Sequence, residues 1–550
     1  ELPPYLQKDE NLQKWMTLMK LICDSPASEE AESRPKNDAE ARSRDRIIYW
    51  GNKKSCAEIL SKFVQKYGNV KWVDKKDEQA ARSIETRYLV PFLETFVKTL
   101  LRRKTHFVAN KYSYYLAKYC FYAVRSKGLF ERINPVLEEL LFDIYLPMVF
   151  ITENDVSVWK EDPIEYIRRQ ENESSKSKEL RIQGLDNIEM ICMKNSPSGK
   201  RYLLIFMEFA ACVLAKGINP RTNEKTDLVM KQSILNILRN IQGQIEKVPE
   251  INSQMETLLE KFVIPEFKSE IGFLRATACN LFGTYGRELE FNNTDLVKMA
   301  TEGLYSCLLD KELPVRISAA ANMHNLLRQE AATELLRPHV KDILQMYLKV
   351  MDELDFEDTV TALEGFVSKY QEEVTPFAMD LITRLIEAFF SFNNNDDEEN
   401  DEAQLSAEGC LCAIQKLLGA NLSQEAYHKA FDIMIPVFNY TLSEKGCDYF
   451  DDAIGCLNCF LFHMTELSEK IWHYYLVLNY LMAGKPEKIQ LDFDPETCPE
   501  EKKLILEQSE AGWGAEYVEQ TLGALQNYIK KGKTIMLQAK DPAYGITYLE

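Results

Sequence analysis

The stretch LLDKELPVRISAAANMHNLL, residues 308–327, decides the fold class, because it holds a polar break between two helical patterns. An apolar pattern with helical spacing ends at Asp310. Pro314 suits the first turn of the next helix, where a backbone N–H has no intrahelical partner. The three alanines at 319–321 allow two helices to approach closely. The stretch therefore predicts two helices packed as a pair.

The same plan recurs upstream in SEIGFLRATACNLFGTYG, residues 269–286, where Leu274 and Arg275 precede Ala276 and Ala278. Helix pairs follow one another along the chain with a period of about 40 residues, which is the range of HEAT and armadillo arrays. We expect the arginine of such a unit to bond a carboxylate on the neighbouring unit and so to join the two.

Apolar residues at i, i+3, i+4 and i+7 predict amphipathic helices through most of the chain, and no alternating strand pattern appears. The predicted helices cover 8–23, 47–67, 78–103, 109–127, 129–150, 199–216, 225–246, 252–268, 271–286, 294–309, 313–328, 331–352, 356–371, 376–392, 405–419, 424–442, 448–466, 469–483 and 515–531. A lone hairpin buries too few side chains to offset its ordering entropy, so the pairs must stack. We expect an all-α fold, an α-solenoid superhelix of HEAT-type antiparallel helix pairs.

Polar segments interrupt this pattern in four places, near 25–46, 171–179, 393–404 and 486–499. The helical period resumes on both sides of each segment. They are therefore predicted to be inter-helix insertions or partly disordered loops, and residues 1–550 are predicted to form a single continuous solenoid.

Charge is unevenly distributed along the chain. The net charge is −19, yet residues 1–130 hold 25 Lys plus Arg against 16 Asp plus Glu. The window 352–402 holds 16 acidic residues against only Lys369 and Arg384. Such a surface repels nucleic acid and attracts polycations over a Debye length of about 8 Å. The predicted binding residues for a basic partner are Asp352, Glu353, Asp355, Glu357, Asp358, Glu372, Glu373, Asp396, Asp397, Glu398, Glu399, Asp401 and Glu402.

Cysteine usage and apolar runs bear on the compartment. Thirteen cysteines in 550 residues are too sparse for a disulfide scaffold and favour a reducing compartment. The N-terminal ELPPYLQKDENLQ lacks the features of a signal peptide. The longest apolar run, from Tyr202, is interrupted by Glu208 and is too short to span a bilayer. We expect a soluble protein that is neither secreted nor inserted in a membrane.

Motifs for chemistry are weak in this sequence. GKT at residues 532–534 ends like a phosphate loop, but Asn527 stands where the first glycine is required. Cys456, Cys459 and His463 share one helix face, with Cys447 upstream, but apolar neighbours favour packing over zinc. No motif of a hydrolase, metalloprotease or dinucleotide enzyme occurs. We expect no catalytic activity, metal or cofactor.

A basic cluster, LRRKTHF at residues 101–107, lies near Lys98, Lys111 and Lys118. It fits either a phosphate backbone or a solvated helix end, where cations suit the helix dipole. The excess of acid elsewhere argues against nucleic acid, so an acidic surface of this chain or of a partner is the better match for the cluster.

Four stretches in the same order resemble the importin seven and eight type of nuclear transport receptor, within the importin-β superfamily. They are VWKEDPIEYIRRQ from Val158, FVIPEFKSEIGFLRATAC from Phe262, ELPVRISAA from Glu312 and YQEEVTPFAMDL from Tyr370. The resemblance covers nearly the whole chain. The family's N-terminal repeats, which carry a principal Ran contact, are expected to be absent, as for a central fragment.

The resemblance implies a receptor that binds basic cargo, such as ribosomal proteins and histones, on a concave acidic surface. It also implies control by the Ran GTPase, contact with Phe-Gly repeats of pore proteins, pairing with importin-β for linker histone, and shuttling between cytoplasm and nucleus. Two alternatives remain at this stage. One is an exportin of the type that recycles importin-α, and the other is a static HEAT scaffold for a phosphatase or kinase.

Overall fold

A computed structural model describes residues 9–26, 28–36, 38–68, 83–171, 180–193, 197–353, 357–393, 401–419, 422–483, 517–532 and 535–538. These residues contain helices and no strand, with a single isolated bridge between Ile218 and Lys225. The chain divides into two compact units. Unit 1 is Glu1–Leu296 with Asp310–Ser318, and unit 2 is Val297–Leu309 with Ala319–Glu550.

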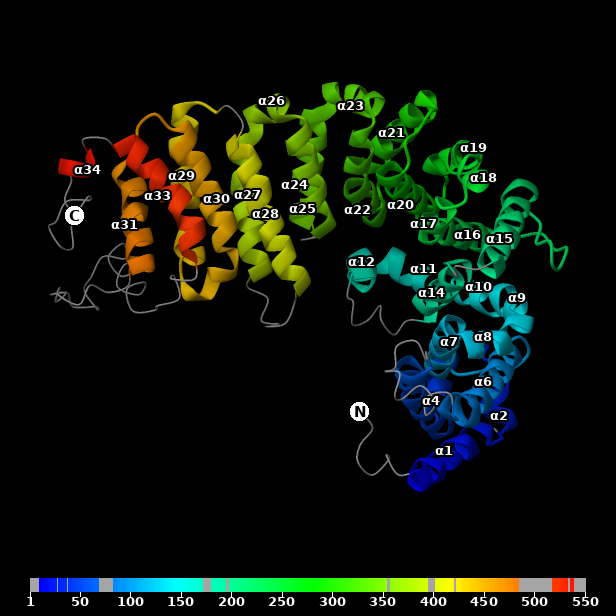
Figure 1. Ribbon diagram of the computed structural model, residues 1–550. Helices are drawn as coiled ribbons and strands as arrows, with labels where there is room; N and C mark the ends of the chain where they lie inside the picture. The colour runs from blue at the N-terminus through cyan, green and yellow to red at the C-terminus, as the bar shows by residue number, and fades with distance from the viewer. Residues whose placement is uncertain are drawn as a thin grey trace. The chain divides into compact units, whose positions relative to one another are not determined.

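Unit 1 stacks helix hairpins in two layers (Figure 1). The second helices of its hairpins pack consecutively: α4 (Ile48–Tyr67), α7 (Asn110–Arg125), α14 (Leu180–Met193), α16 (Leu228–Asn240) and α20 (Gly272–Glu288). Their first helices form the other layer: α1 (Asp9–Asp24), α6 (Val90–Arg102), α10 (Leu146–Met148), α15 (Pro197–Lys216) and α19 (Met255–Phe262). The 3-10 turn η7 (Ile264–Lys268) joins α19 to α20. This is the stacked-pair plan that the sequence predicts.

Unit 2 repeats the same plan. Its second layer is α25 (Glu357–Lys369), α28 (Asp401–Gly419), α30 (Phe450–His463) and α33 (Val518–Gly532). Its first layer is α24 (Val340–Glu353), α27 (Ala378–Asn393), α29 (Gln424–Thr441) and α31 (Glu469–Ala483). The predicted all-α solenoid of HEAT-type helix pairs is confirmed, whereas the single continuous array over 1–550 stays a prediction.

The described residues contain further helices and turns besides these two layers. In unit 1 they are α2 (Glu29–Glu32), α3 (Asp38–Asp45), η4 (Glu85–Leu89), α8 (Lys127–Ile133), η5 (Asn134–Val136), α9 (Leu137–Glu139), η6 (Leu140–Tyr145), α11 (Glu153–Glu161), α12 (Pro163–Glu171), α17 (Gln242–Ile245) and α18 (Pro249–Asn252). The others are α21 (Thr294–Leu308), α22 (Leu313–Met323), η8 (His324–Arg328), α23 (Glu330–Leu336), η9 (Arg337–His339), α26 (Gln371–Val374), η10 (Thr375–Phe377), η11 (Glu444–Tyr449) and α34 (Ile535–Gln538).

Buried tyrosines join helices within the stack. The Tyr285 hydroxyl of α20 donates to the Leu238 carbonyl at the end of α16, at 3.1 Å. The Tyr528 hydroxyl of α33 donates to the Ile471 carbonyl of α31, at 2.7 Å. Each ring fills the core while its hydroxyl satisfies a carbonyl, so these side chains stabilise the packing without leaving an unpaired polar group.

Several local predictions were wrong, among them the single helix over 331–352, which is divided into α23, η9 and α24. Residues 129–150 are not one helix but the run α8, η5, α9, η6 and α10, because Pro135 has no N–H to continue the ladder. The pattern missed α14, since its buried face carries the polar pair Gln183 and Asn187. It also missed α11 and α12. Part of the 25–46 insertion is helical, as α2 and α3, while residues 172–179, 394–400 and 486–499 lie outside the described residues.

Candidate functional site

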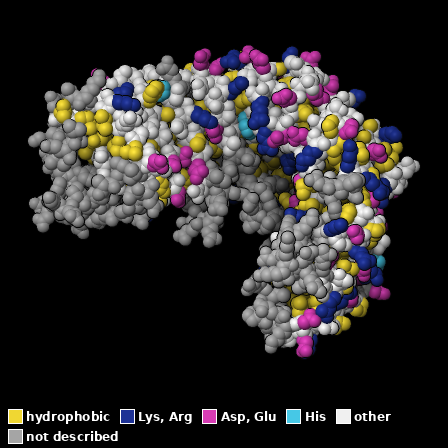
Figure 2. Space-filling view, viewed as in Figure 1, with side chains coloured by type: hydrophobic (Ala, Val, Ile, Leu, Met, Phe, Trp, Pro, Cys, Tyr) yellow, Lys and Arg dark blue, Asp and Glu magenta, His cyan; other side chains and the backbone are white. Residues whose placement is uncertain are grey.

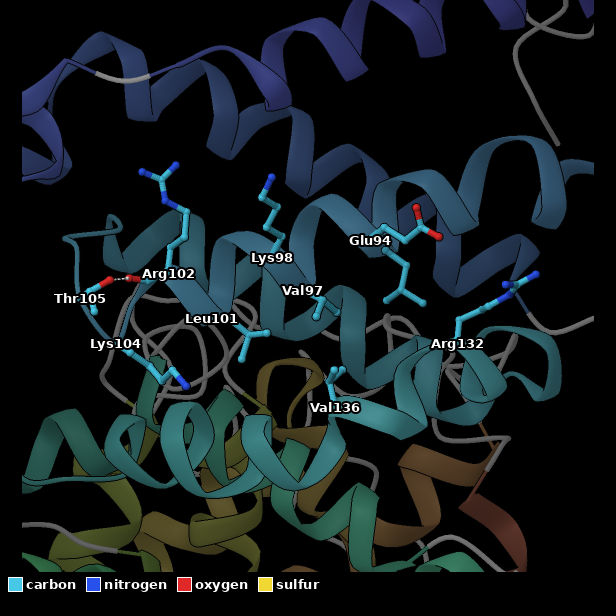
Figure 3. A pocket seen from close by; sticks show the side chains of 10 residues that line it. Glu94, Val97, Lys98, Leu101, Arg102, Lys104, Thr105, Arg132 and Val136 are labelled. Atoms are coloured by element: carbon cyan, nitrogen blue, oxygen red, sulfur yellow. Dashed lines mark hydrogen bonds between the residues drawn. The ribbon is translucent and has the colours of Figure 1, made fainter. Parts of the chain in front are cut away.

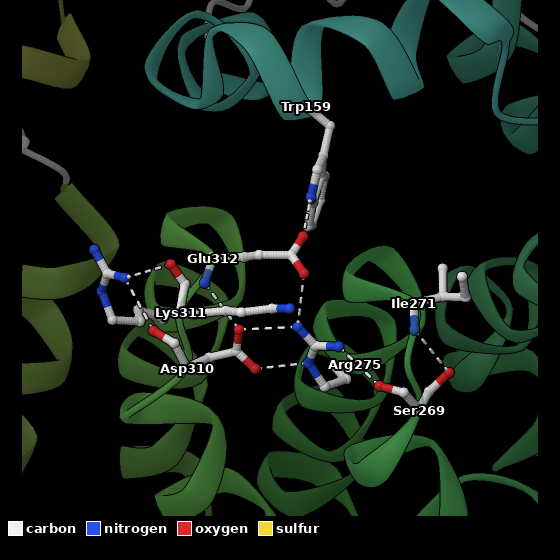
Figure 4. A network of polar contacts seen from close by, with 8 residues as sticks. Trp159, Ser269, Ile271, Arg275, Asp310, Lys311 and Glu312 are labelled. Carbon is white, nitrogen blue, oxygen red and sulfur yellow. Dashed lines mark hydrogen bonds and ion pairs between the residues drawn. The ribbon is translucent and has the colours of Figure 1, made fainter.

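Two groups of carboxylates in the described residues need an explanation, and the first is a buried network in unit 1 (Figure 4). Arg275 of α20 binds Asp310 in a bidentate pair, with Nε to Oδ2 at 2.6 Å and Nη2 to Oδ1 at 2.9 Å. Nη2 also donates to Glu312 Oε1 at 2.9 Å. The Arg275 side chain is only 8% exposed. The predicted bond from this arginine to a neighbouring repeat is therefore confirmed.

Each charged group of this network has a hydrogen-bonded partner of opposite charge. Burial alone would lower the pKa of the Arg275 guanidinium, but its hydrogen bonds to Asp310 and Glu312 raise that pKa above the ordinary value. A Cβ at Gly272 would overlap the Glu312 carboxylate, so any larger residue there would require that carboxylate to move. Arg316, the corresponding arginine of the next unit, instead donates to the Asp310 carbonyl at 2.9 Å.

A tryptophan from a distant segment completes the network. Trp159 lies on α11, which starts with a capping box between Thr152 and Asp155. Its Nε1 donates to Glu312 Oε2 at 2.6 Å, and its ring meets Tyr166 of α12 edge to face at 4.8 Å. The network thus brings together three of the four stretches that carry the family resemblance. Because each charged group of the network already has a partner, the network stabilises the fold and is not a binding site for a ligand.

The second group is an acidic ladder, which we define as Glu364 of α25, Glu408 of α28 and Asp452 of α30. These carboxylates recur at intervals of 44 residues on consecutive helices of the second layer of unit 2. All three side chains are half-buried. Figure 2 shows Asp and Glu side chains gathered over α28 and α30, where the exposed Asp451 adds a further charge.

The ladder is only partly neutralised. Lys416 pairs with Glu364, and Gln404 Nε2 donates to Glu408 Oε1 at 3.3 Å. Burial, followed by the negative charges of Glu408 and Asp451, raises the pKa of Asp452 above its ordinary value.

A thiol next to the ladder experiences the same negative field. Cys412 Sγ donates to Asp452 Oδ1 at 3.5 Å. Burial and the charges of Asp452 and Glu364 raise the pKa of this thiol to about 11. The ladder is therefore a place where added positive charge lowers the free energy.

The structure places few side chains of the predicted acidic site. Asp352, Glu353, Glu357, Asp358, Asp401 and Glu402 belong to α24, α25 and α28, but their side chains lie outside what the structure describes. Asp355, Asp396, Asp397, Glu398 and Glu399 lie outside the described residues. Of the two that remain, Glu373 pairs with Arg337 and Glu372 is exposed. The predicted site stays a prediction, and the acidic ladder was missed although its 44-residue spacing is visible in the sequence.

The cysteine and basic motifs serve packing within the described residues. Cys456 Sγ lies 3.5 Å from the Leu411 carbonyl and Cys459 Sγ lies 3.7 Å from the Gln415 carbonyl, so both thiols point at α28. No group of three or more potential metal ligands occurs in the described part of the chain. Of the GKT motif, only Gly532, at the end of α33, lies in the described residues.

The basic cluster is largely paired inside unit 1. Arg103 donates to the Val108 carbonyl and to Asn110 Oδ1, at 2.9 and 2.8 Å, and burial lowers its pKa to about 10. Arg102 pairs with Glu32, and Lys104 pairs with Glu139. Carboxylates of unit 1 thus occupy Arg102 and Lys104, and carbonyl and amide oxygens occupy Arg103. Among the helices described, none is long and apolar enough to cross a membrane.

Curated relatives match along most of this chain. The importin beta-like SAD2 homolog of Arabidopsis thaliana is 24% identical over 549 residues, which cover 99% of this chain and 50% of the relative. Importin-8 of Homo sapiens is 23% identical over 478 residues, covering 86% of this chain and 44% of the relative. The chain therefore spans about half the length of the relatives it matches. No family model matches it.

Solved structures share the fold. The exportin Cse1 in its cargo-free, cytoplasmic state superposes with a TM-score of 0.60 at 15% identity, over 98% of this chain and 52% of that chain. Lph2, a bidirectional nuclear transport receptor of S. cerevisiae, gives a TM-score of 0.52 at 14% identity, over 98% of this chain and 56% of that chain. These structures show that the chain shares their helical fold, and the curated relatives show that its sequence is similar to importins of the importin-7 and importin-8 type.

Proposed function

We propose that this chain forms part of a nuclear import receptor that binds basic cargo proteins on the acidic ladder of unit 2. The observation that carries the proposal is the recurrence of Glu364, Glu408 and Asp452 on three successive helices of one layer. Exposed charge pairs contribute only about 0–1 kcal/mol each, so a repeated array gains affinity by multiplicity and loses it as salt rises. A protein segment with clustered Lys and Arg fits such an array.

The rest of the proposal follows from the similarity to these importins. Ribosomal proteins and histones are the cargo class that fits the charge, and the Ran GTPase controls their release. Phe-Gly repeats of pore proteins and importin-β are further partners, and the receptor moves between cytoplasm and nucleus. Its mechanism is reversible binding, without catalysis and without direct contact to nucleic acid. In the sequence, the predicted acidic residues between Asp352 and Glu402 add negative charge to the part of the chain that begins the ladder.

A binding assay with a matched control tests the ladder. The triple variant Glu364→Gln, Glu408→Gln and Asp452→Asn should bind a Lys- and Arg-rich histone tail peptide about 5- to 100-fold more weakly than the wild type at low salt, from the summed pair energies. The control variant, Glu387→Gln, Glu425→Gln and Glu469→Gln, removes three charges from first-layer helices α27, α29 and α31. Equal losses in both variants would leave only net charge as the cause and would contradict the assignment to the ladder.

Transport direction needs the full-length protein and Ran. A pull-down on a core histone or a ribosomal protein should retain cargo without Ran-GTP and lose it when Ran-GTP is added. Cargo retained only in the presence of Ran-GTP would instead indicate an exportin. Cargo binding that changes neither when Ran-GTP is added nor when the salt concentration is raised would contradict the transport mechanism.

A further inference from the structure

An apolar hollow of about 650 Å³ lies in unit 1, between α6 and the segment formed by α8 and η5 (Figure 3). Its floor includes Val97 and Leu101 of α6 and Val136 of η5, whose side chains point toward one another in Figure 3 and are each half-buried. These aliphatic groups leave apolar area in contact with water, and a partner side chain that covered them would gain the hydrophobic free energy of that area.

Positive charge surrounds this floor. The lining includes Lys98, Arg102, Lys104 and Arg132, with Glu94 as its one carboxylate. Arg102 and Lys104 are engaged by carboxylates outside the lining, as described above. Lys98 and Arg132 form no ion pair with the described residues. Between Glu94 and Glu131 the sequence contains neither Asp nor Glu, so α6 and α7 supply no carboxylate beyond Glu94 to pair with them.

A second hollow, of about 540 Å³, lies on the other side of α6 and shares Glu94, Lys98 and Arg102 with the first. Its own carboxylates are engaged, Asp24 by Lys20 and Glu32 by Arg102. Trp50 lines it, and the buried Nε1–H of Trp50 has no acceptor among the described residues. The ridge that α6 forms between the two hollows therefore presents Lys98 to both of them, and no carboxylate of the described residues forms an ion pair with Lys98.

We propose that this ridge binds a short acidic peptide segment of a partner protein, with one apolar side chain on the Val97, Leu101 and Val136 floor and carboxylates at Lys98 and Arg132. The apolar floor and the two cations together favour an acidic peptide with one apolar side chain. A neutral apolar peptide would leave both cations unpaired, and a nucleic acid backbone would leave the aliphatic floor uncovered, since that floor has no aromatic ring for a base to stack on. The site lies in unit 1, apart from the acidic ladder of unit 2, so its partner is distinct from basic cargo.

Fluorescence anisotropy with three labelled peptides and the full chain tests the proposal. The first peptide has a central Leu flanked by Asp and Glu, the second replaces each acid by its amide, and the third replaces Leu by Ala. The acidic Leu peptide should bind at least tenfold more tightly than either of the other peptides. A higher salt concentration should weaken the binding of the acidic Leu peptide. Equal binding of the amide peptide, equal binding of a neutral Phe-Gly peptide, or no binding of the acidic Leu peptide would overturn the proposal.

Charge reversal locates the site. The variant Lys98→Glu with Arg132→Glu should lose at least tenfold in affinity for the acidic Leu peptide. The control Lys261→Glu with Lys268→Glu makes the same change in net charge at exposed positions of α19 and η7 and should bind as the wild type does. Thermal unfolding of each variant checks that the fold is kept. A loss of equal size in the control would overturn the assignment to α6 and α8.

Discussion

The buried network of unit 1 and the acidic ladder of unit 2 both consist of carboxylates on helices of a stacked layer, yet their environments are opposite. Asp310 and Glu312 meet the buried Arg275 guanidinium, and Glu312 also accepts the indole N–H of Trp159. In the ladder, Asp452 accepts a hydrogen bond from a thiol, and burial followed by the charges of Glu408 and Asp451 raises its pKa.

This difference separates structural charges from charges available for binding. A carboxylate whose hydrogen-bonding capacity is already used has little to gain from a ligand, and its loss leaves a buried partner uncompensated. The charged form of a carboxylate that lies among other carboxylates is destabilised by repulsion, and a bound cation reduces this repulsion. Composition alone, which counts both groups as acidic, does not distinguish them.

Removal of the guanidinium should produce the largest effect of any single change. Arg275→Met leaves the half-buried Asp310 and Glu312 without their counter-ion, and we expect a loss of about 3 kcal/mol in local stability, the lower end for a buried pair. Hydrogen exchange of the α20 amides measures this loss as faster opening of that helix. Arg287→Met, on the same helix but at an exposed ion pair with its neighbour Glu288, is the matched control and should change exchange little. Equal effects of both variants would refute the difference between the two environments.

Loss of the indole N–H should have the next largest effect. Trp159→Phe keeps an aromatic ring against Tyr166 but deletes the hydrogen bond to Glu312, a charged acceptor, at a cost of about 1.5–3 kcal/mol. Faster hydrogen exchange in α11 and α12 is the expected result. Trp50→Phe, which removes an indole N–H that has no acceptor in the described residues, should leave those helices unchanged. Unchanged exchange in Trp159→Phe would show that packing alone holds α11.

Much of the fold was predictable because each repeat carries its own signal. The break at Asp310, the proline at 314 and the small residues that follow mark a helix start without reference to the rest of the chain. Such a signal fails where burial is not apolar. Asn187 of α14 donates to the Ala117 carbonyl at 2.9 Å, so a neighbouring helix satisfies a polar side chain that the periodicity treats as exposed.

The candidate site was predictable only in part, because some of its residues lie far apart in the sequence. Arg275 and Asp310 lie in neighbouring repeats, and their pairing follows from the repeat plan. Trp159 lies 153 residues before Glu312, on the helix α11 that the apolar periodicity missed, so no local pattern links the two. The prediction selected acidic residues from one window of the sequence, 352–402. The ladder instead consists of residues that recur along the chain and lie close together only when the hairpins stack.

A single change in the ladder should have a smaller effect than a change in the network. Glu408→Gln should weaken the binding of a Lys- and Arg-rich histone tail peptide by no more than about 1 kcal/mol, a factor of about five, because a single surface charge pair contributes no more than that. Isothermal titration at low salt measures this change, with Glu425→Gln as an exposed control on α29. A loss as large as that of the triple variant would mean that the ladder acts as one coupled site and not as an additive array.

The smallest effect is a gain in stability with a defined pH dependence. The raised pKa of Asp452 means that the folded chain binds this proton more tightly than the unfolded chain, whose aspartates titrate near 3.8. Stability therefore falls as pH rises from 3.8 through the raised value, and the penalty is complete above it. Asp452→Asn removes the penalty, so its thermal midpoint should exceed that of the wild type at pH 7, by less at pH 5. Since the same variant should bind basic cargo more weakly, a midpoint that is unchanged or lower at pH 7 would show that the ladder carboxylates are satisfied in the free protein, as those of the Arg275 network are.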